Sequence, residues 1–184
     1  MKKIALLGDS VRLFGYGTKV PALLGEEYEV YQPQENCRFV KNTLRMVFDH
    51  AEELKGCEVI HWNNGLWDVS RLFEDGELFT SDREYLENML RVATLLKKIT
   101  PNVIFATTTP VLEKHPHNDN ADIDRFNAIL VPKLQEMGIV INDLNSLVKQ
   151  DPKKYIRSDD MIHLTDEGID ACAEQVVKYI KAFE

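Results

Sequence analysis

The sequence predicts a three-layer α/β/α protein with a mainly parallel sheet of about five strands. Short apolar runs of strand length alternate with longer amphipathic segments from one end of the chain to the other. Each apolar run ends in a polar loop, which is typical of strands buried on both faces of a parallel sheet. Alternating strands and helices require crossover connections, and these place helices on both faces of the sheet.

The strands are predicted from apolar runs, the clearest of which is rich in β-branched and aromatic residues. The run near residue 30 is the weakest and is expected at an edge of the sheet. In chain order the predicted strands are Lys3–Leu7, Tyr28–Tyr31, Glu58–Trp62, Asn102–Thr107 and Gly138–Ile141.

The helices are predicted from their end signals and apolar stripes. Ser81 and Glu84 form a capping box ahead of a stripe that begins at Tyr85, and Pro101 is expected to end that helix. Thr165, with acidic residues directly behind it, is expected to cap the last helix. The further predicted helices are Cys37–Leu54 and Asp122–Met137, the second of which contains Pro132.

Composition excludes several classes of protein. The chain has 184 residues with 22 basic and 30 acidic side chains, a net charge of −8. The length suits one domain, residues 1–184, and the negative charge disfavours binding to nucleic acid or anionic membranes.

Cys37, Cys57 and Cys172 have no metal or redox spacing, so reduced structural thiols are expected. The first apolar run is too short for a signal peptide, and no run approaches the ~20 apolar residues of a membrane span, so we expect a cytoplasmic protein.

Polar residues follow several of the predicted strands. In open parallel sheets, functional groups gather beyond the carboxyl ends of the strands. Gly8-Asp9-Ser10 follows the first strand, where glycine permits a tight turn and the hydroxyl can project into the crevice. The same tripeptide also suits an ordinary turn into a helix.

A histidine near the other end of the chain could complete such a site. A nucleophilic serine needs a base of near-neutral pKa, and the imidazole needs an acceptor on its other nitrogen. Asp160 precedes His163 by three residues on the turn into the last helix, and can supply that acceptor locally. The loop His61–Asp68 contains two Trp and two Asn, and an amide side chain suits an oxyanion hole. Solvated turns remain the alternative for both segments.

Together these three segments resemble the SGNH, or GDSL, hydrolase family of esterases and acylhydrolases. Gly8-Asp9-Ser10 is similar to the first block of the family, and Asp160-x-x-His163 is similar to its last block. The resemblance covers nearly the whole chain and implies a flavodoxin-like sheet. It also implies that Ser10 is the nucleophile and donates its backbone amide, that His163 is the base, and that Asp160 orients His163.

The middle blocks depart from the usual family pattern. Where the family has Gly-x-Asn-Asp, residues Gly65–Asp68 read Gly-Leu-Trp-Asp, which is similar to a variant subgroup with Asn-x-Gly-Leu. This resemblance implies that Asn63 is the oxyanion donor, with Asn64 as the second candidate for that role. The block that normally provides a glycine amide reads Glu35-Asn36-Cys37-Arg38, so the Arg38 amide is expected in that role.

The function predicted from these residues and the resemblance is hydrolysis of a small-molecule ester by a Ser-His-Asp triad, with no metal or other cofactor. Aromatic and hydrogen-bonding side chains around Ser10 suit a small acyl group, such as acetyl, on a polar or carbohydrate alcohol. A non-catalytic α/β binding protein and a thioesterase or lysophospholipase of the same family stay open. His115 and His117 lack a third ligand at a metal spacing, and His61 is expected to be a hydrogen-bonded core residue.

Overall fold

Five parallel strands form one sheet in the computed structural model, which describes residues 1–183. The strand order is β2-β1-β3-β4-β5, the flavodoxin-like order, and β2 lies at an edge as expected. The strands are β1 (Lys2–Leu7), β2 (Tyr28–Tyr31), β3 (Val59–Asn63), β4 (Asn102–Ala106) and β5 (Val140–Asn142). The predicted fold class, an α/β fold with a parallel sheet flanked by helices, is therefore confirmed.

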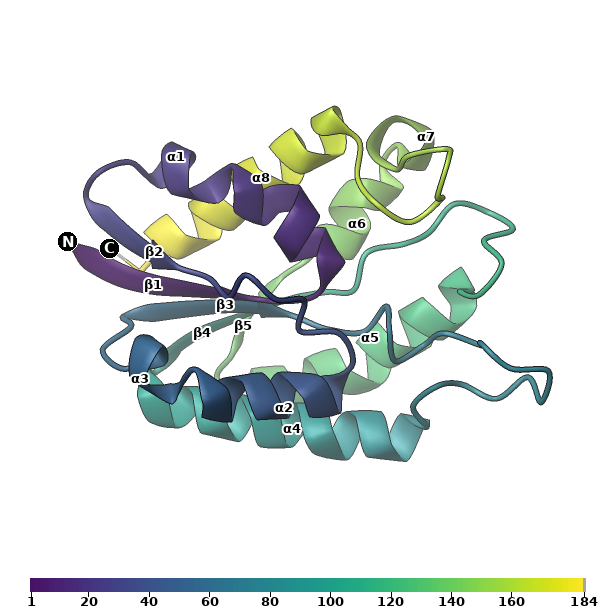
Figure 1. Ribbon diagram of the computed structural model, residues 1–184, viewed down its shortest axis with the longest axis horizontal. Helices are drawn as coiled ribbons and strands as arrows, with labels where there is room; N and C mark the ends of the chain where they lie inside the picture. The colour runs from purple at the N-terminus through teal and green to yellow at the C-terminus, as the bar shows by residue number, and fades with distance from the viewer. Residues whose placement is uncertain (184) are drawn as a thin grey trace.

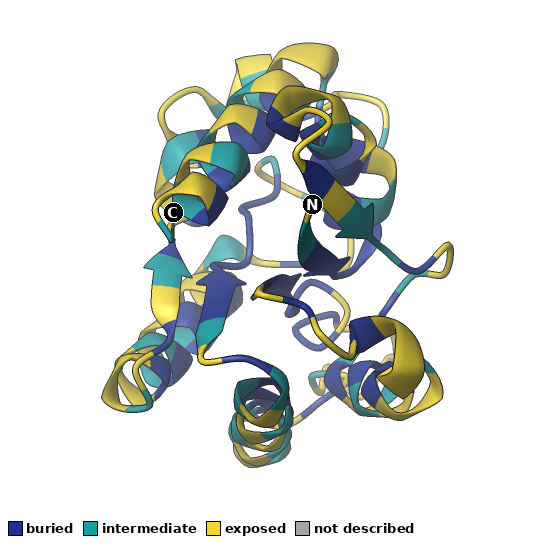
Figure 2. Cartoon of the chain, turned by 90° about the vertical axis from the view of Figure 1, so that its left-hand side faces the viewer, coloured by how far each residue is buried: buried dark blue, intermediate teal, exposed yellow. Residues whose placement is uncertain are grey.

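Helices cover both faces of this sheet (Figure 1). One face carries α2 (Val40–Asp49), α3 (Ala51–Leu54), α4 (Asp82–Ile99) and α5 (Asn120–Glu136). The other carries α1 (Val20–Leu24), α6 (Leu144–Lys149), α7 (Pro152–Tyr155) and α8 (Asp166–Lys181). The helices turn their buried residues toward the sheet (Figure 2), and the inner part of β1 is buried from Ile4 to Leu7.

The predicted capping residues lie at the starts of α4 and α8. Ser81 Oγ accepts the Glu84 N–H (3.3 Å) at the start of α4, and Thr165 Oγ1 accepts the Gly168 N–H (3.1 Å) at the start of α8. Helix α4 ends at Ile99, before Pro101, as predicted. The predicted helix Asp122–Met137 begins two residues earlier, because Asp119 caps it by accepting the Ala121 N–H.

The predicted helix Cys37–Leu54 is wrong at its start and in its middle. Arg38 has a left-handed backbone (φ 50°) and Phe39 is extended, so α2 begins only at Val40. The first N–H group of α2 has a partner distant in sequence, since Asp68 accepts the Val40 N–H with both carboxylate oxygens (3.2 Å each). A break at His50 then separates α2 from α3.

All strands end at the same edge of the sheet because they are parallel. Figure 1 shows the N-terminus at the opposite end of the molecule, where β1 begins. The connection after β1 is a π-helical segment, Val11–Gly15, followed by a 3₁₀ turn, Tyr16–Thr18, and the sequence pattern predicted neither. Within residues 1–183 no helix combines the length and apolar character needed to cross a bilayer. The three cysteines are free and buried.

Candidate active site

Ser10 lies just beyond the carboxyl end of β1. Gly8 makes this turn possible, because a Cβ atom there would collide with the side-chain oxygen of Asn63. Asp9 caps the helical segment that follows, since its Oδ1 accepts the Val11 N–H (3.0 Å), whereas the Ser10 side chain makes no capping hydrogen bond. The Ser10 hydroxyl is therefore not consumed by the turn that positions it.

One carboxylate holds both the backbone and the ring of His163. Asp160 Oδ1 accepts the N–H of Ile162 (3.1 Å) and of His163 (2.9 Å), and Oδ2 lies 3.0 Å from the imidazole Nδ1. Burial alone would raise the pKa of the Asp160 carboxyl, but these hydrogen bonds outweigh it and leave the pKa below its ordinary value. An ionised acceptor at Nδ1 keeps the proton there, so Nε2 is the nitrogen able to accept one.

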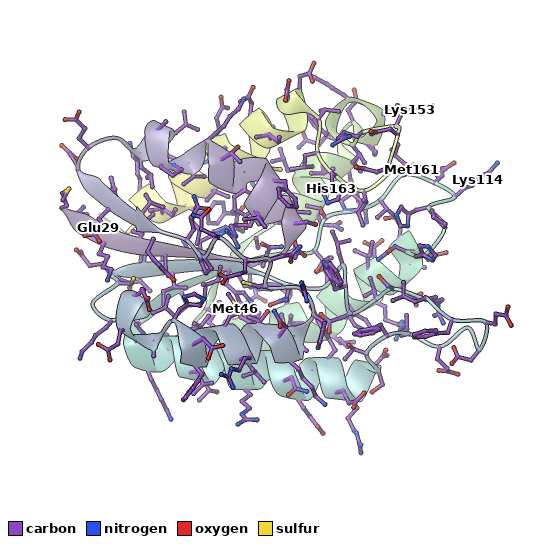
Figure 3. The ribbon with its side chains drawn as sticks, viewed as in Figure 1. Glu29, Met46, Lys114, Lys153, Met161 and His163 are labelled. Atoms are coloured by element: carbon purple, nitrogen blue, oxygen red, sulfur yellow. The ribbon has the colours of Figure 1, made fainter. Side chains whose placement is uncertain are left out.

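Ser10 and His163 line the same pocket, whose volume is about 810 Å³. The Nε2 atom of His163 is shielded from solvent and has no hydrogen-bond partner within residues 1–183. Figure 3 shows His163 beside the helical segment that follows β1 and far from Glu29, which lies on β2 at the other end of the sheet. A buried acceptor without a partner is rare in proteins, and here it belongs to a ring that lines the pocket together with Ser10.

The amide of Asn63 is held at both ends. Its Nδ2 donates to Asp9 Oδ1 (2.8 Å), and its Oδ1 accepts from the Tyr16 hydroxyl (2.8 Å). Asp9 Oδ1 also accepts the Val11 N–H, so it acts as an acceptor, and the end of the amide that faces it must be nitrogen. The second hydrogen of Nδ2 has no partner in the described chain. Asn63 can therefore donate one further hydrogen bond without giving up either contact.

Tyr16 and Asp9 take part in this site, and sequence reasoning missed both roles. Burial raises the pKa of the Tyr16 phenol well above its usual range, so the hydroxyl remains a donor. Burial also raises the pKa of Asp9, against the opposing effect of its hydrogen bond from Asn63. The Tyr16–Asn63 contact joins positions 47 residues apart, and no sequence pattern marks such a pair.

A buried arginine clamps the turn that holds Ser10. The guanidinium of Arg12 is fully buried and donates to the backbone carbonyls of Gly8 (3.2 Å), Pro33 (2.7 Å) and Glu35 (2.8 Å). These contacts tie the end of β1 to the segment after β2. The turn that carries Ser10 is thus braced by a charged group whose three hydrogen bonds all go to backbone oxygen, while its buried Nε has no partner within residues 1–183.

The other two residues expected near the oxyanion are engaged elsewhere. Asn64 is fully buried, accepts from the Thr43 hydroxyl (2.8 Å) and the Trp62 indole (2.7 Å), and donates to the Arg38 carbonyl (2.8 Å). Arg38 adopts a left-handed conformation that glycine adopts easily, at the block where the resembled family has glycine. Its N–H, however, donates to Asn36 Oδ1 (2.8 Å), so the expected donor is occupied in this structure.

His61 and His115 support the core and a loop. His61 is buried with Nε2 3.1 Å from Asn142 Nδ2, and burial lowers its pKa to about 3, so it is the core residue that was expected. His115 Nδ1 accepts the N–H groups of His117 (3.2 Å) and Asn118 (3.0 Å) and so holds its own loop. In the part of the chain that the structure describes, no three metal-ligating side chains lie together.

Solved structures share this fold, although no protein-family model and no curated protein matches the sequence. A lipase/acylhydrolase from Enterococcus faecalis superimposes with a TM-score of 0.80 at 19% identity, over 99% of this chain and 96% of the other. The acetyl xylan esterase AlAXEase gives 0.77 at 21% identity, over 97% and 99%. Axe2, an acetylxylan esterase from Geobacillus stearothermophilus, gives 0.74 at 17% identity, over 97% and 94%. The fold is thus one that acylhydrolases and acetylxylan esterases use.

Proposed function

We propose that the protein is a serine ester hydrolase that removes small acyl groups, acetyl above all, from a polar or carbohydrate alcohol. One observation carries the proposal: Asp160 holds His163, whose Nε2 has no partner within residues 1–183, in a pocket that Ser10 also lines. The structural neighbours support it, being described as a lipase/acylhydrolase and as acetylxylan esterases. We further propose that the chain is an SGNH hydrolase of the subgroup with Asn-x-Gly-Leu, on the ground of its sequence motifs at Gly8–Ser10, Asn63–Leu66 and Asp160–His163.

The spacing of the base and its partner adds support. Two of the Axe2 structures are of catalytic mutants, one at a histidine and one at an aspartate three positions before it. His163 and Asp160 have the same spacing in this chain. A separation of three lets the carboxylate bind the backbone and the ring of one histidine together, which restricts the orientation of the imidazole.

In the first half of the reaction, Ser10 Oγ attacks the ester carbonyl carbon while its proton passes to His163 Nε2. Asp160 keeps the other ring proton on Nδ1 and stabilises the imidazolium. The oxyanion accepts from the Ser10 N–H and from the free Nδ2 hydrogen of Asn63. The Arg38 N–H joins these donors by exchanging its bond to Asn36 for the oxyanion.

The first half ends when the carbon–oxygen bond to the alcohol breaks. His163 gives its proton to the departing oxygen, which leaves an acyl ester on Ser10. In the second half, the acyl group is transferred from Ser10 to water. Water then attacks that ester as Nε2 takes its proton, and the acid leaves as the proton returns to Ser10. Each step uses only side chains, backbone N–H groups and water.

Labelling by a fluorophosphonate probe tests the nucleophile. We expect the wild type and a Ser70→Ala control to be labelled and Ser10→Ala to remain unlabelled; Ser70 is as little exposed as Ser10 but donates to the Leu66 carbonyl (2.9 Å). Ser10→Ala and His163→Ala should each remove nearly all ester hydrolysis, with the double variant little worse, because triad members act as a unit. Labelling of Ser10→Ala, or more than a tenth of the rate remaining in either variant, would remove that residue from the mechanism. A wild type that takes up no label and hydrolyses no ester would favour a non-catalytic binding protein.

The acyl preference is tested with p-nitrophenyl esters from acetate to decanoate, followed by acetylated xylose. We expect kcat/KM to be highest at the short end and the acetylated sugar to be cleaved. A steady rise in kcat/KM beyond butyrate would instead favour the lysophospholipase or thioesterase alternative.

A further inference from the structure

The pocket at Ser10 and His163 lies between the segment after β1 and the start of α8. Its apolar lining comes from Val11, Phe14, Gly15, Leu164 and Ile169, and its remaining polar lining from Arg157, Asp160, Thr165, Asp166 and Glu167. A volume of about 810 Å³ is far more than an acetyl group fills and is in the range of sites for whole small molecules. Most of the pocket must therefore serve another part of the substrate.

The chemistry of ester cleavage decides which part. The leaving oxygen must reach His163 Nε2, which protonates it, whereas the carbonyl oxygen must face the oxyanion donors. The pocket is lined by His163 but not by Asn63 or Arg38. It therefore lies on the side of Ser10 where the alcohol departs.

Phe14 places an exposed aromatic ring on this side of the pocket. The residue is 64% exposed although it is large and apolar, and its ring meets the imidazole of His163 edge-on with the centroids 6.4 Å apart. It belongs to the π-helical segment that begins directly after Ser10, so the position of the ring is coupled to that of the nucleophile. An exposed ring beside several polar groups suits the C–H face of a sugar, with its hydroxyls directed to those groups.

The charges of the pocket restrict the alcohol further. Asp166 and Glu167 are exposed in the first turn of α8. Among the residues that the structure places around this pocket, Arg157 is the only Arg or Lys, and it is paired with Asp159 and with Asp160 (Nε to Oδ2 3.7 Å). A phosphorylated alcohol or a coenzyme A thiol would thus meet repulsion without a free cation to offset it.

We propose that this pocket is the subsite for the leaving alcohol, that Phe14 is its stacking platform, and that it selects neutral polyhydroxy alcohols over anionic ones. The inference rests on the proposed function and adds to it the substrate class on the leaving-group side. Phe14 is then a specificity-determining residue, and the acidic first turn of α8 excludes anionic alcohols.

The test compares two esters of one acid that differ only in the alcohol: acetylated methyl xyloside and ethyl acetate, whose alcohol is too small to reach the ring. Phe14→Ala should lower the ratio of their kcat/KM values by roughly five- to tenfold, and Phe14→Tyr should retain it because the ring remains. Phe48→Ala is the matched control, since Phe48 is 71% exposed on α2 beside Arg45. An unchanged ratio in Phe14→Ala, or the same fall in Phe48→Ala, would overturn the subsite.

A second arm tests the charge selection. The wild type should cleave the neutral acetylated xyloside at least about tenfold more efficiently than its phosphorylated counterpart, and Glu167→Gln should narrow that difference. Equal efficiency toward the two esters in the wild type would contradict the proposal. Fluorophosphonate labelling and ethyl acetate hydrolysis report on the proposed function separately. If the wild type shows neither labelling nor ethyl acetate hydrolysis, both proposals fail. If it shows both, but Phe14→Ala leaves the ratio of the two kcat/KM values unchanged, the subsite alone is overturned.

Discussion

The side chain of Asn63 shows how much of the proposed chemistry depends on single contacts. Its amide is already oriented by Tyr16 and Asp9, with one N–H hydrogen left unused. We expect Asn63→Ala to lower kcat by ~10²–10³-fold with little change in KM, because the donor acts on the oxyanion and not on the bound ester. Asn64→Ala should mainly lower the melting temperature, since the Asn64 side chain is fully buried and its hydrogen bonds hold Thr43, Trp62 and the Arg38 carbonyl together. Steady-state kinetics that reversed this ranking would assign the oxyanion to Asn64.

Tyr16 provides a second test at the same scale. Removing its hydroxyl frees the Asn63 amide to rotate, so we expect Tyr16→Phe to lower kcat by roughly three- to tenfold at constant KM. In an Asn63→Ala background the same substitution should cost nothing further, because the amide that it orients is absent. Tyr85→Phe is the control, as this equally buried hydroxyl donates to the Asn64 carbonyl (3.2 Å). A loss that persisted in the Asn63→Ala background would mean that Tyr16 acts only on the fold.

At the scale of elements, the site depends on how closely β1 and β3 approach at their carboxyl ends. The two strands pair in register from Ile4 opposite Val59 to Leu7 opposite Trp62, which brings Gly8 against the side chain of Asn63. A methyl group at Gly8 would also press on the Cβ of Arg12, 2.9 Å away. The two elements leave no space for any side chain at this position.

Gly8→Ala should therefore displace the Asn63 amide. We expect a fall in kcat approaching that of Asn63→Ala, accompanied by a lower melting temperature. Kinetics and thermal unfolding of one preparation measure both effects. A stable Gly8→Ala protein with full activity would show that the close approach of the two strands is not needed for the reaction.

At the scale of the whole molecule, buried titratable groups make stability depend on pH. His61 stays neutral in the folded protein because burial lowers its pKa from 6.5 to about 3, whereas the unfolded chain takes up a proton below pH 6.5. Its contribution to stability is thus complete above pH 6.5 and is lost as the pH falls toward 3. Asp68 acts in the opposite sense, since burial raises its pKa to about 7 and the folded state retains a proton that the unfolded chain releases.

We expect His61→Gln to reduce the loss of unfolding free energy between pH 7 and pH 4 by about 3 kcal/mol relative to the wild type. Comparing two proteins that share Asp68 cancels its opposing contribution. Urea unfolding at the two pH values measures the difference, and the exposed His117→Gln should leave the loss as in the wild type. Parallel losses in the wild type and His61→Gln would assign the acid sensitivity to other groups.

Much of the architecture could be predicted because it depends on residues close together in the chain. Apolar runs predicted all five strands, and Ser81 and Thr165 predicted helix starts through contacts three residues long. The spacing of Asp160 and His163 suggested their pairing for the same reason, since one turn brings them together. The helix from Cys37 was predicted too early because its true cap, Asp68, lies 28 residues beyond its first residue.

The surroundings of the candidate nucleophile depended on the tertiary structure alone. The Asn63 amide is oriented by partners 47 and 54 positions away, and Arg38 and Asn64 meet across 26 positions. Such pairs follow from the register of β1 against β3 and from the burial that removes water as a competing partner. Local sequence patterns contain no information on this register or on the partners of buried polar groups. Hydrophobic periodicity specifies which face of an element is buried but not which polar atoms meet there. By itself the sequence determined the fold class and the strand positions and marked candidate reactive residues, and the packing of distant strand ends decided which atoms hold those candidates in place.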